Sequence, residues 1–189
     1  MVKKFLFLCI AMIGAATMAH GQRVAVKTNM LYWATASLNA GVDVAVSDRS
    51  TLGLSVSGNP WTVGSRAKIQ HFFAMPEYRY WFCGKYTRGF LMVQALAGKY
   101  TVGGFKLPFD VFPSFREHHY KGWAAGAGIG YGYAWYLGAH WNLEASLAVG
   151  YARMRYHRTD HPETKVSRNY VGPTHIGVSF VYLFNSKKL

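Results

Sequence analysis

Five charged residues stand where period-two patterning places them opposite an apolar face: Lys27, Asp43, Glu77, Arg79 and Glu144. A charge that leaves water is costly unless it is paired and hydrogen-bonded. The sequence therefore predicts an internal Glu–Arg network to which these residues contribute. Glu77 and Arg79 also have the chemistry of a gate, although a structural ion pair is the favoured interpretation.

Four histidines form a second candidate group in two polar segments: His118, His119, His157 and His161. Both segments are expected to be loops on the same side of the fold, where the imidazoles can meet and bind a partner. Imidazole is also a zinc ligand, but His157 and His161 match no specific metal-binding spacing. The favoured interpretation is solvated loop polarity, and we expect neither a metal nor another cofactor.

The glycine run GWAAGAGIGYGYAWYL, residues 122–137, does not form a phosphate cradle. A dinucleotide-binding fingerprint needs G-x-G-x-x-G, and its third glycine would fall on Tyr131. The small residues recur at a period of two, which is the period of a strand. This segment is therefore predicted to be a strand with one nearly bare face and one aromatic and aliphatic face.

Catalytic residues are not evident. Ser146 and Ser179 lie well within predicted strands, and no nucleophile elbow surrounds either serine. His175 lies at the start of the strand that contains Ser179. A hydrolase would need a nucleophile beside a base. The sequence therefore predicts a protein without enzymatic activity, with an outer-membrane enzyme that modifies lipid or peptide as an open alternative.

Period-two alternation recurs in eight segments, and no convincing helical periodicity competes with it. The predicted strands cover residues 23–33, 37–46, 51–58, 69–82, 89–102, 122–137, 141–156 and 174–184. Pro76 falls inside the fourth and cannot donate a ladder hydrogen bond, so we expect a bulge or a bend there.

The predicted connections alternate in length. Short connections are expected at residues 47–50, 83–88 and 138–140, and longer ones at 58–67, 103–120 and 157–169. The first connection, near Trp33–Thr35, is short where a longer one is expected. Short turns at one end and longer loops at the other are typical of outer-membrane barrels with an even number of strands.

The first 21 residues resemble a secretory signal peptide, with Lys3 and Lys4 before an apolar run and small residues before Gln22. The predicted organisation is a signal peptide at 1–21 and a single barrel domain at 22–189. Removal of the signal changes the formal net charge from +13 to +11 and leaves Cys83 as the remaining cysteine. Export excludes nucleic acid as a partner and favours an anionic lipid or polysaccharide surface.

Each predicted strand has an apolar face and a small or polar face. We expect the apolar face to contact lipid and the polar face to line the lumen of the barrel. Eight strands enclose just enough space for their own side chains, so the many Trp, Tyr, Phe and Leu residues cannot all point inward. The predicted fold class is all-β, an eight-stranded antiparallel, up-and-down transmembrane β-barrel in the outer membrane of a Gram-negative bacterium. A plugged lumen would make it a non-porin. A soluble periplasmic barrel that binds an apolar ligand remains an alternative.

Several blocks also carry a family resemblance, notably TNMLY at 28–32, PEYRYW at 76–81 and GPT at 172–174. Between Lys27 and Phe184 the chain resembles a family of Bacteroidetes-type outer-membrane β-barrels that is classed as a domain of unknown function. Some members resemble accessory proteins of fimbrial loci, which implies a structural, surface-binding or assembly role. The partners implied are outer-membrane lipid, lipopolysaccharide, the barrel-insertion machinery and surface or fimbrial proteins.

Overall fold

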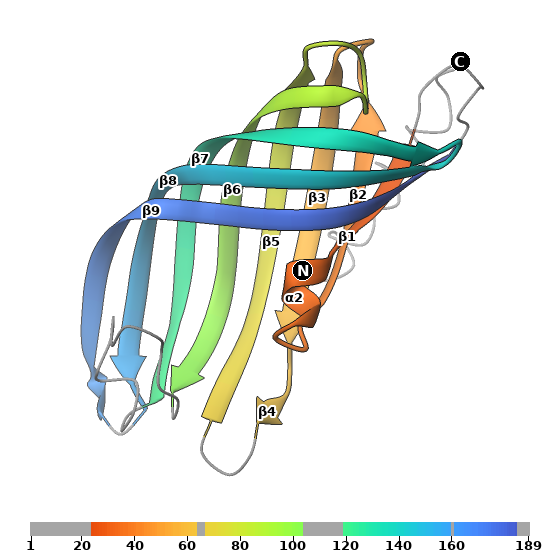
Figure 1. Cartoon of the computed structure of the whole chain (residues 1–189). Helices are drawn as coiled ribbons and strands as arrows, with labels where there is room; N and C mark the ends of the chain where they lie inside the picture. The colour runs from red at the N-terminus through yellow and green to blue at the C-terminus, as the bar shows by residue number, and fades with distance from the viewer. Residues whose placement is uncertain (1–23, 64–66, 104–118, 160, 185–189) are drawn as a thin grey trace, which may run out of the picture.

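The computed structural model describes residues 24–63, 67–103, 119–159 and 161–184, which form a closed antiparallel β-barrel (Figure 1). Its elements are β1 (Val24–Asn29), α2 (Met30–Trp33), β2 (Leu38–Ala45), β3 (Ser50–Asn59), β4 (Thr62–Val63), β5 (Ala67–Trp81), β6 (Arg88–Gly103), β7 (His119–Gly138), β8 (Trp141–Arg158) and β9 (His161–Leu183). Eight strands form the wall, and the two-residue β4 extends it beside β5. The predicted all-β class and eight-stranded antiparallel barrel are confirmed.

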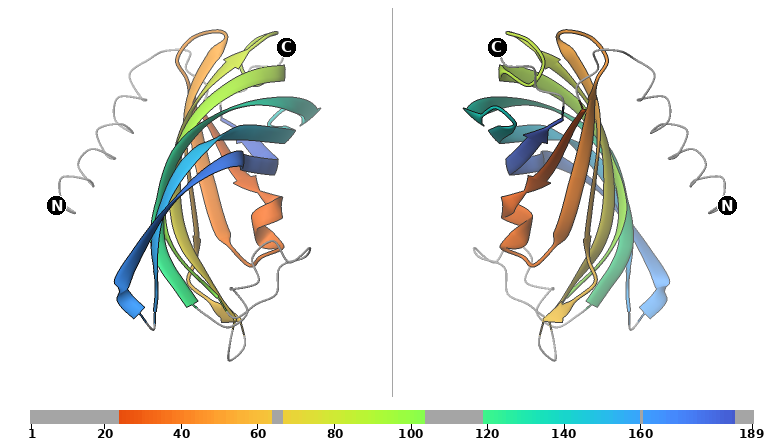
Figure 2. Two further views of the ribbon diagram at one scale, coloured as in Figure 1. Left: turned by 90° about the vertical axis from the view of Figure 1, so that its left-hand side faces the viewer. Right: turned by 90° about the vertical axis from the view of Figure 1, so that its right-hand side faces the viewer.

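The wall closes because each strand pairs with two neighbours. The strands follow the order β3-β2-β1-β9-β8-β7-β6-β5, and β5 pairs with β3 to complete the circle. Figure 2 shows the curved wall from two sides, with the first and last strands next to each other. Among the described residues, no helix is long and apolar enough to cross a membrane.

The first strand is shorter than predicted, because residues 30–33 form the helical turn α2. The side chain of Asn29 caps this turn by accepting a hydrogen bond from the Leu31 backbone N–H at 3.1 Å. Side chains of this type favour helix starts for that reason. The connection between β1 and β2 therefore spans residues 30–37, and the expected short connection near Trp33–Thr35 is wrong.

The predicted loop at 157–169 is also wrong, because β8 continues to Arg158 and β9 begins at His161, and these two residues pair. The register pairs His157 with Lys165 and Arg155 with Ser167. These extensions lack an apolar alternation, so the pattern that predicts strands is absent from them. Backbone hydrogen bonds between the two strands hold the extension without it.

Pro76 does not produce the expected bulge. The pairing of β5 with β6 keeps one register on both sides of it, from Ala74 opposite Ala97 to Glu77 opposite Gln94. Met75 and Pro76 have no partner in that ladder, whereas the pairing with β3 is continuous. The proline nitrogen removes a donor without adding a residue, and the strand therefore stays in register.

The two faces of the wall differ sharply in polarity. The outward face is apolar, and its large side chains are open to the surroundings, with Ile129 at 65% and Leu147 at 51% of full accessibility. The inward face is polar at mid-barrel. Its buried polar and charged residues include Lys27, Asp43, Glu77, Arg79, Gln94, Asn142, Glu144 and Ser179.

An apolar cluster fills the lumen near the short turns. Trp81, Tyr86 and Phe90 are 0–3% exposed, and the Trp81 and Phe90 ring centroids are 4.5 Å apart. Tyr86 belongs to the turn between β5 and β6, folds inward, and donates a hydrogen bond from its hydroxyl to the Asp43 carbonyl at 3.1 Å. The turn itself thus contributes to closing this end of the barrel.

Candidate functional site

The register brings the five predicted lumenal charges together from four strands. Lys27 comes from β1, Asp43 from β2, Glu77 and Arg79 from β5, and Glu144 from β8. Asp43 and Glu77 both lie opposite Gly53 of β3. A side chain at position 53 would overlap the Asp43 carboxylate. The glycine therefore leaves the space in which the carboxylates approach a common cation.

Two cations and three carboxylates form one continuous network. The Lys27 ammonium lies 2.9 Å from Asp43 Oδ1 and also pairs with Glu77. The Arg79 guanidinium lies 3.1 Å from Glu77 Oε1 and 2.9 Å from Glu144 Oε2. Its Nη1 is also 3.5 Å from Asp43 Oδ2. Opposite charges therefore surround each other across the lumen.

The network is buried and is backed by an aromatic ring. Its side chains are 0–7% exposed. The Arg79 guanidinium lies 4.6 Å from the centroid of the Phe90 ring, a cation–π distance. The ion pairs and the aromatic cluster around Phe90 are both buried in the lumen. This arrangement can hold the wall together and block the lumen.

One contact was not anticipated from the sequence. The Ser146 hydroxyl lies 3.0 Å from His175 Nε2, between β8 and β9. The two strands shift register here: Ala148 pairs with His175 and Val149 with Pro173. Thr174 is the extra residue. Both side chains lie before this shift, with Ser146 opposite Gly177 and His175 opposite Ala148, and they are therefore diagonal neighbours on the inward face. The alternation of the sequence could not reveal the pair, because it does not give the register between two strands.

Three of the four candidate histidines lie in the described residues, at the long-loop end of the barrel. His118 lies outside the described residues. His119 begins β7 opposite Gly103, and His161 begins β9 opposite Arg158. His157 lies in β8 opposite Lys121. In the described part of the chain, no group of three or more metal-ligating side chains is found.

A cavity of about 720 Å³ lies at this same end of the barrel. Its lining comes from β3, β5, β6, β7 and β8 and the residue after β3, and includes Asn59, Pro60, His71, Tyr100, Trp123, Arg155 and Tyr156. A much smaller cavity, about 20 Å³, lies against the ion-pair network and His175. The wide cavity is therefore at the long-loop end, and the small one lies beside the ion pairs.

The fold and this site define a class: a closed eight-stranded antiparallel β-barrel with a charged interior and an apolar exterior. The chain belongs to the family described as Protein of unknown function (DUF3575), whose model matches residues 5–184. The suspected membership of a family of unknown function is thereby confirmed. Comparison with curated proteins and with solved structures gave no match.

Proposed function

We propose that this protein is a small, non-porin outer-membrane β-barrel that anchors a surface-binding or assembly function at its long-loop end. The observation that carries the proposal is the inverted polarity of the wall. Charges are buried inside, while large aliphatic and aromatic side chains face outward. A protein in water would expose its charges and bury the apolar face. In a lipid bilayer the opposite arrangement is the stable one.

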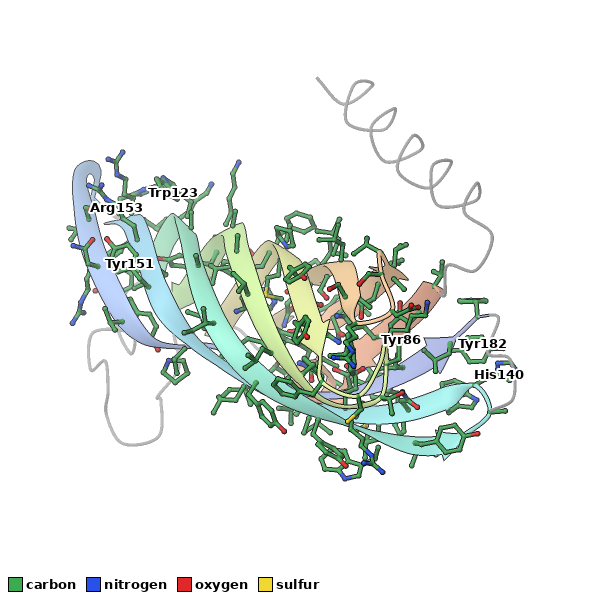
Figure 3. The ribbon with its side chains drawn as sticks, turned by 90° about the horizontal axis from the view of Figure 1, so that it is seen from above. Tyr86, Trp123, His140, Tyr151, Arg153 and Tyr182 are labelled. Carbon is green, nitrogen blue, oxygen red and sulfur yellow. The ribbon has the colours of Figure 1, made fainter. Side chains whose placement is uncertain are left out.

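The height of the apolar band supports the same proposal. On the outward face of β8, Trp141 near the short turns and Tyr151 near the long loops are ten residues apart. At ~3.3 Å per residue and a tilt of ~40°, ten residues rise ~25 Å. Apolar bands of outer-membrane barrels are ~25 Å tall and end in aromatic girdles. Tyr182, Trp123 and Tyr151 lie at the two ends (Figure 3).

The closed lumen supports a non-porin role. The network around Arg79 and the cluster around Phe90 leave a cavity of about 20 Å³ beside the charges, enough for about one water. We expect the short turns to face the periplasm and the long-loop end to face the cell surface, after export by the signal peptide. Surface or fimbrial proteins would then bind at the long-loop end.

A pair of matched arginine substitutions tests the lipid-facing assignment. Leu147 lies near mid-band on the outward face of β8, between Trp141 and Tyr151, and Val171 lies opposite Tyr151 at the upper limit of the band. In a lipid-embedded barrel, Leu147→Arg should lower the free energy of unfolding by ~2–4 kcal/mol and Val171→Arg by ~0–1 kcal/mol. Urea unfolding in lipid vesicles measures the change in stability. Cell fractionation of the wild-type protein measures whether it is found with the outer membrane.

A soluble barrel predicts a different result. Both positions would then be water-exposed surface, and each arginine would change the stability by less than ~0.5 kcal/mol. Equal, small effects together with a wild-type protein that fractionates with the soluble periplasm would overturn the proposal. The wild-type protein should instead remain folded in unboiled detergent and migrate anomalously on a gel.

Hydrolysis is a second candidate function, because Ser146 and His175 are in hydrogen-bond contact. A working pair needs a third group that orients the base, and His175 Nδ1 is buried without a hydrogen-bond partner. The adjacent cavity of about 20 Å³ also leaves no room for a lipid. A fluorophosphonate probe should leave the protein unlabelled. Labelling lost in Ser146→Ala but kept in Ser179→Ala would establish the enzyme.

A further inference from the structure

The outward face of the barrel carries a cluster of cations at its long-loop end. Lys99 of β6, Trp123 of β7 and Arg155 of β8 stand directly opposite one another in the register. Lys121 lies one outward position nearer the loops, and Arg153 one position nearer the apolar band. Neighbouring strands are ~4.8 Å apart, so these side chains share one surface. We call Lys99, Lys121, Arg153 and Arg155 the cationic patch.

The positive charge of the patch is not neutralised by the described residues. Arg155 lies over the Trp123 ring, 5.7 Å from its centroid, and Arg153 Nε donates to Ser167 Oγ at 3.3 Å. The carboxylates whose side chains the structure describes lie elsewhere. Asp43, Glu77 and Glu144 are lumenal, and Asp48 lies in a short turn at the opposite end.

The position of the patch relative to the apolar band specifies the kind of ligand. Figure 3 shows Arg153 with Trp123 and Tyr151 at one end of the wall, far from Tyr182 and His140. Below the row of Lys99, Trp123 and Arg155, the outward face carries alanines of β6 and β7 in two successive rows. The next row is aliphatic in all three strands, with Val93, Ile129 and Val149 in register. Cations therefore stand at the headgroup level of the proposed outer leaflet, and hydrocarbon-facing side chains continue beneath them.

We propose that the cationic patch binds the phosphate groups of an outer-leaflet glycolipid whose acyl chains lie on the aliphatic rows below. Guanidinium and ammonium groups form charge-assisted hydrogen bonds with phosphate. A free phosphate ion uses only the cations, whereas a phosphorylated lipid uses the cations and the apolar rows together. This inference rests on the proposed outer-membrane function and names the lipid that the barrel binds there.

Binding of lipid A with and without its phosphates tests the inference. The full chain is expressed, and the barrel is purified in detergent as wild type, as K99Q/K121Q/R155Q, and as the control R49Q/K85Q/R88Q from the short-turn end. Each triple variant removes three positive charges. Wild type and control should bind phosphorylated lipid A about tenfold more tightly than the dephosphorylated form. The patch variant should lose this preference.

Two binding results would overturn the inference: no preference for phosphate in the wild type, or an equal loss in the control variant. Displacement of the lipid by millimolar inorganic phosphate would also overturn it, and would identify a free ion as the ligand. Insertion into vesicles is measured on the same samples. Barrels that insert without a phosphate preference contradict only this inference, whereas failure of the wild type to insert contradicts the proposed function.

Discussion

Arg79 connects the carboxylates of the lumen at the scale of single residues. Its guanidinium contacts Glu77 and Glu144 at 3.1 and 2.9 Å and is 3% exposed. Lys27 contacts Asp43 and Glu77 on the other side of the network. Loss of Arg79 would leave Glu144 buried without its cation, and an uncompensated buried charge is strongly destabilising.

Replacement of Arg79 by methionine should therefore lower the free energy of unfolding by ~3–5 kcal/mol. Urea unfolding in lipid vesicles measures the change. Arg49→Met, at an exposed position in a short turn, is the control and should change it by less than ~0.5 kcal/mol. The double variant R79M/E144Q should recover part of the loss, because it removes the orphaned charge. An Arg79→Met barrel as stable as the control would contradict this role for the network.

At the scale of elements, β7 shows why one face of a strand is nearly bare. A Cβ at Gly122, Gly126 or Gly130 would first meet backbone oxygens of β8, whereas Gly132 lies beside a side chain that enters the lumen from another strand. A Cβ at Gly132 would overlap the Phe90 ring, and Phe90 is fully buried between Trp81 and Arg79. The ring cannot retreat, so the small residue is a packing requirement.

Gly132→Ala should accordingly lower the free energy of unfolding by ~1–3 kcal/mol, the usual cost of overpacking. Gly138→Ala, in the same strand, is the matched control, because a Cβ there meets nothing within 4 Å. The control should change stability by less than ~0.5 kcal/mol. Comparable effects of the two alanines would show that backbone propensity, and not contact with Phe90, explains the glycine.

The whole molecule has two unlike ends. One has the tight connections 46–49, 82–87 and 139–140, and β9 ends there at Leu183. The other has α2, the end of β6 at Gly103, the start of β7 at His119, the wide cavity and the cationic patch. If the barrel spans the outer membrane as proposed, these two ends face different compartments.

Labelling of cysteines tests which end of the barrel faces the outside of the cell. Cys83 is an exposed free cysteine in a short turn, so a membrane-impermeant maleimide should label it only after the outer membrane is permeabilised. In C83S/T159C the cysteine moves to the β8–β9 turn and should react in intact cells. Labelling of Cys83 in intact cells would reverse the orientation, and labelling of both positions only after permeabilisation would contradict a surface-exposed end.

The strands and their faces are predictable because they depend on local periodicity. Alternation along 122–137 predicts a strand and tells which side chains share a face. Composition then places the apolar face outward, since eight strands cannot enclose it. The same logic misses the paired extension of β8 and β9 through 157–169, where no apolar alternation exists, and the turn α2, which depends on the cap at Asn29.

The sequence by itself thus determined a barrel of eight strands and the residues that point into it. Only the tertiary structure decided which of these meet. Arg79 and Glu144 are 65 residues apart, and their 2.9 Å contact exists because the barrel closes in one register. The Ser146–His175 contact depends on the register between β8 and β9, and the cationic patch depends on the pairings of β6 with β7 and of β7 with β8. Alternation within a strand gives the face on which a side chain lies, but the residue opposite it depends on how neighbouring strands pair. Register is therefore decided by the closed sheet as a whole.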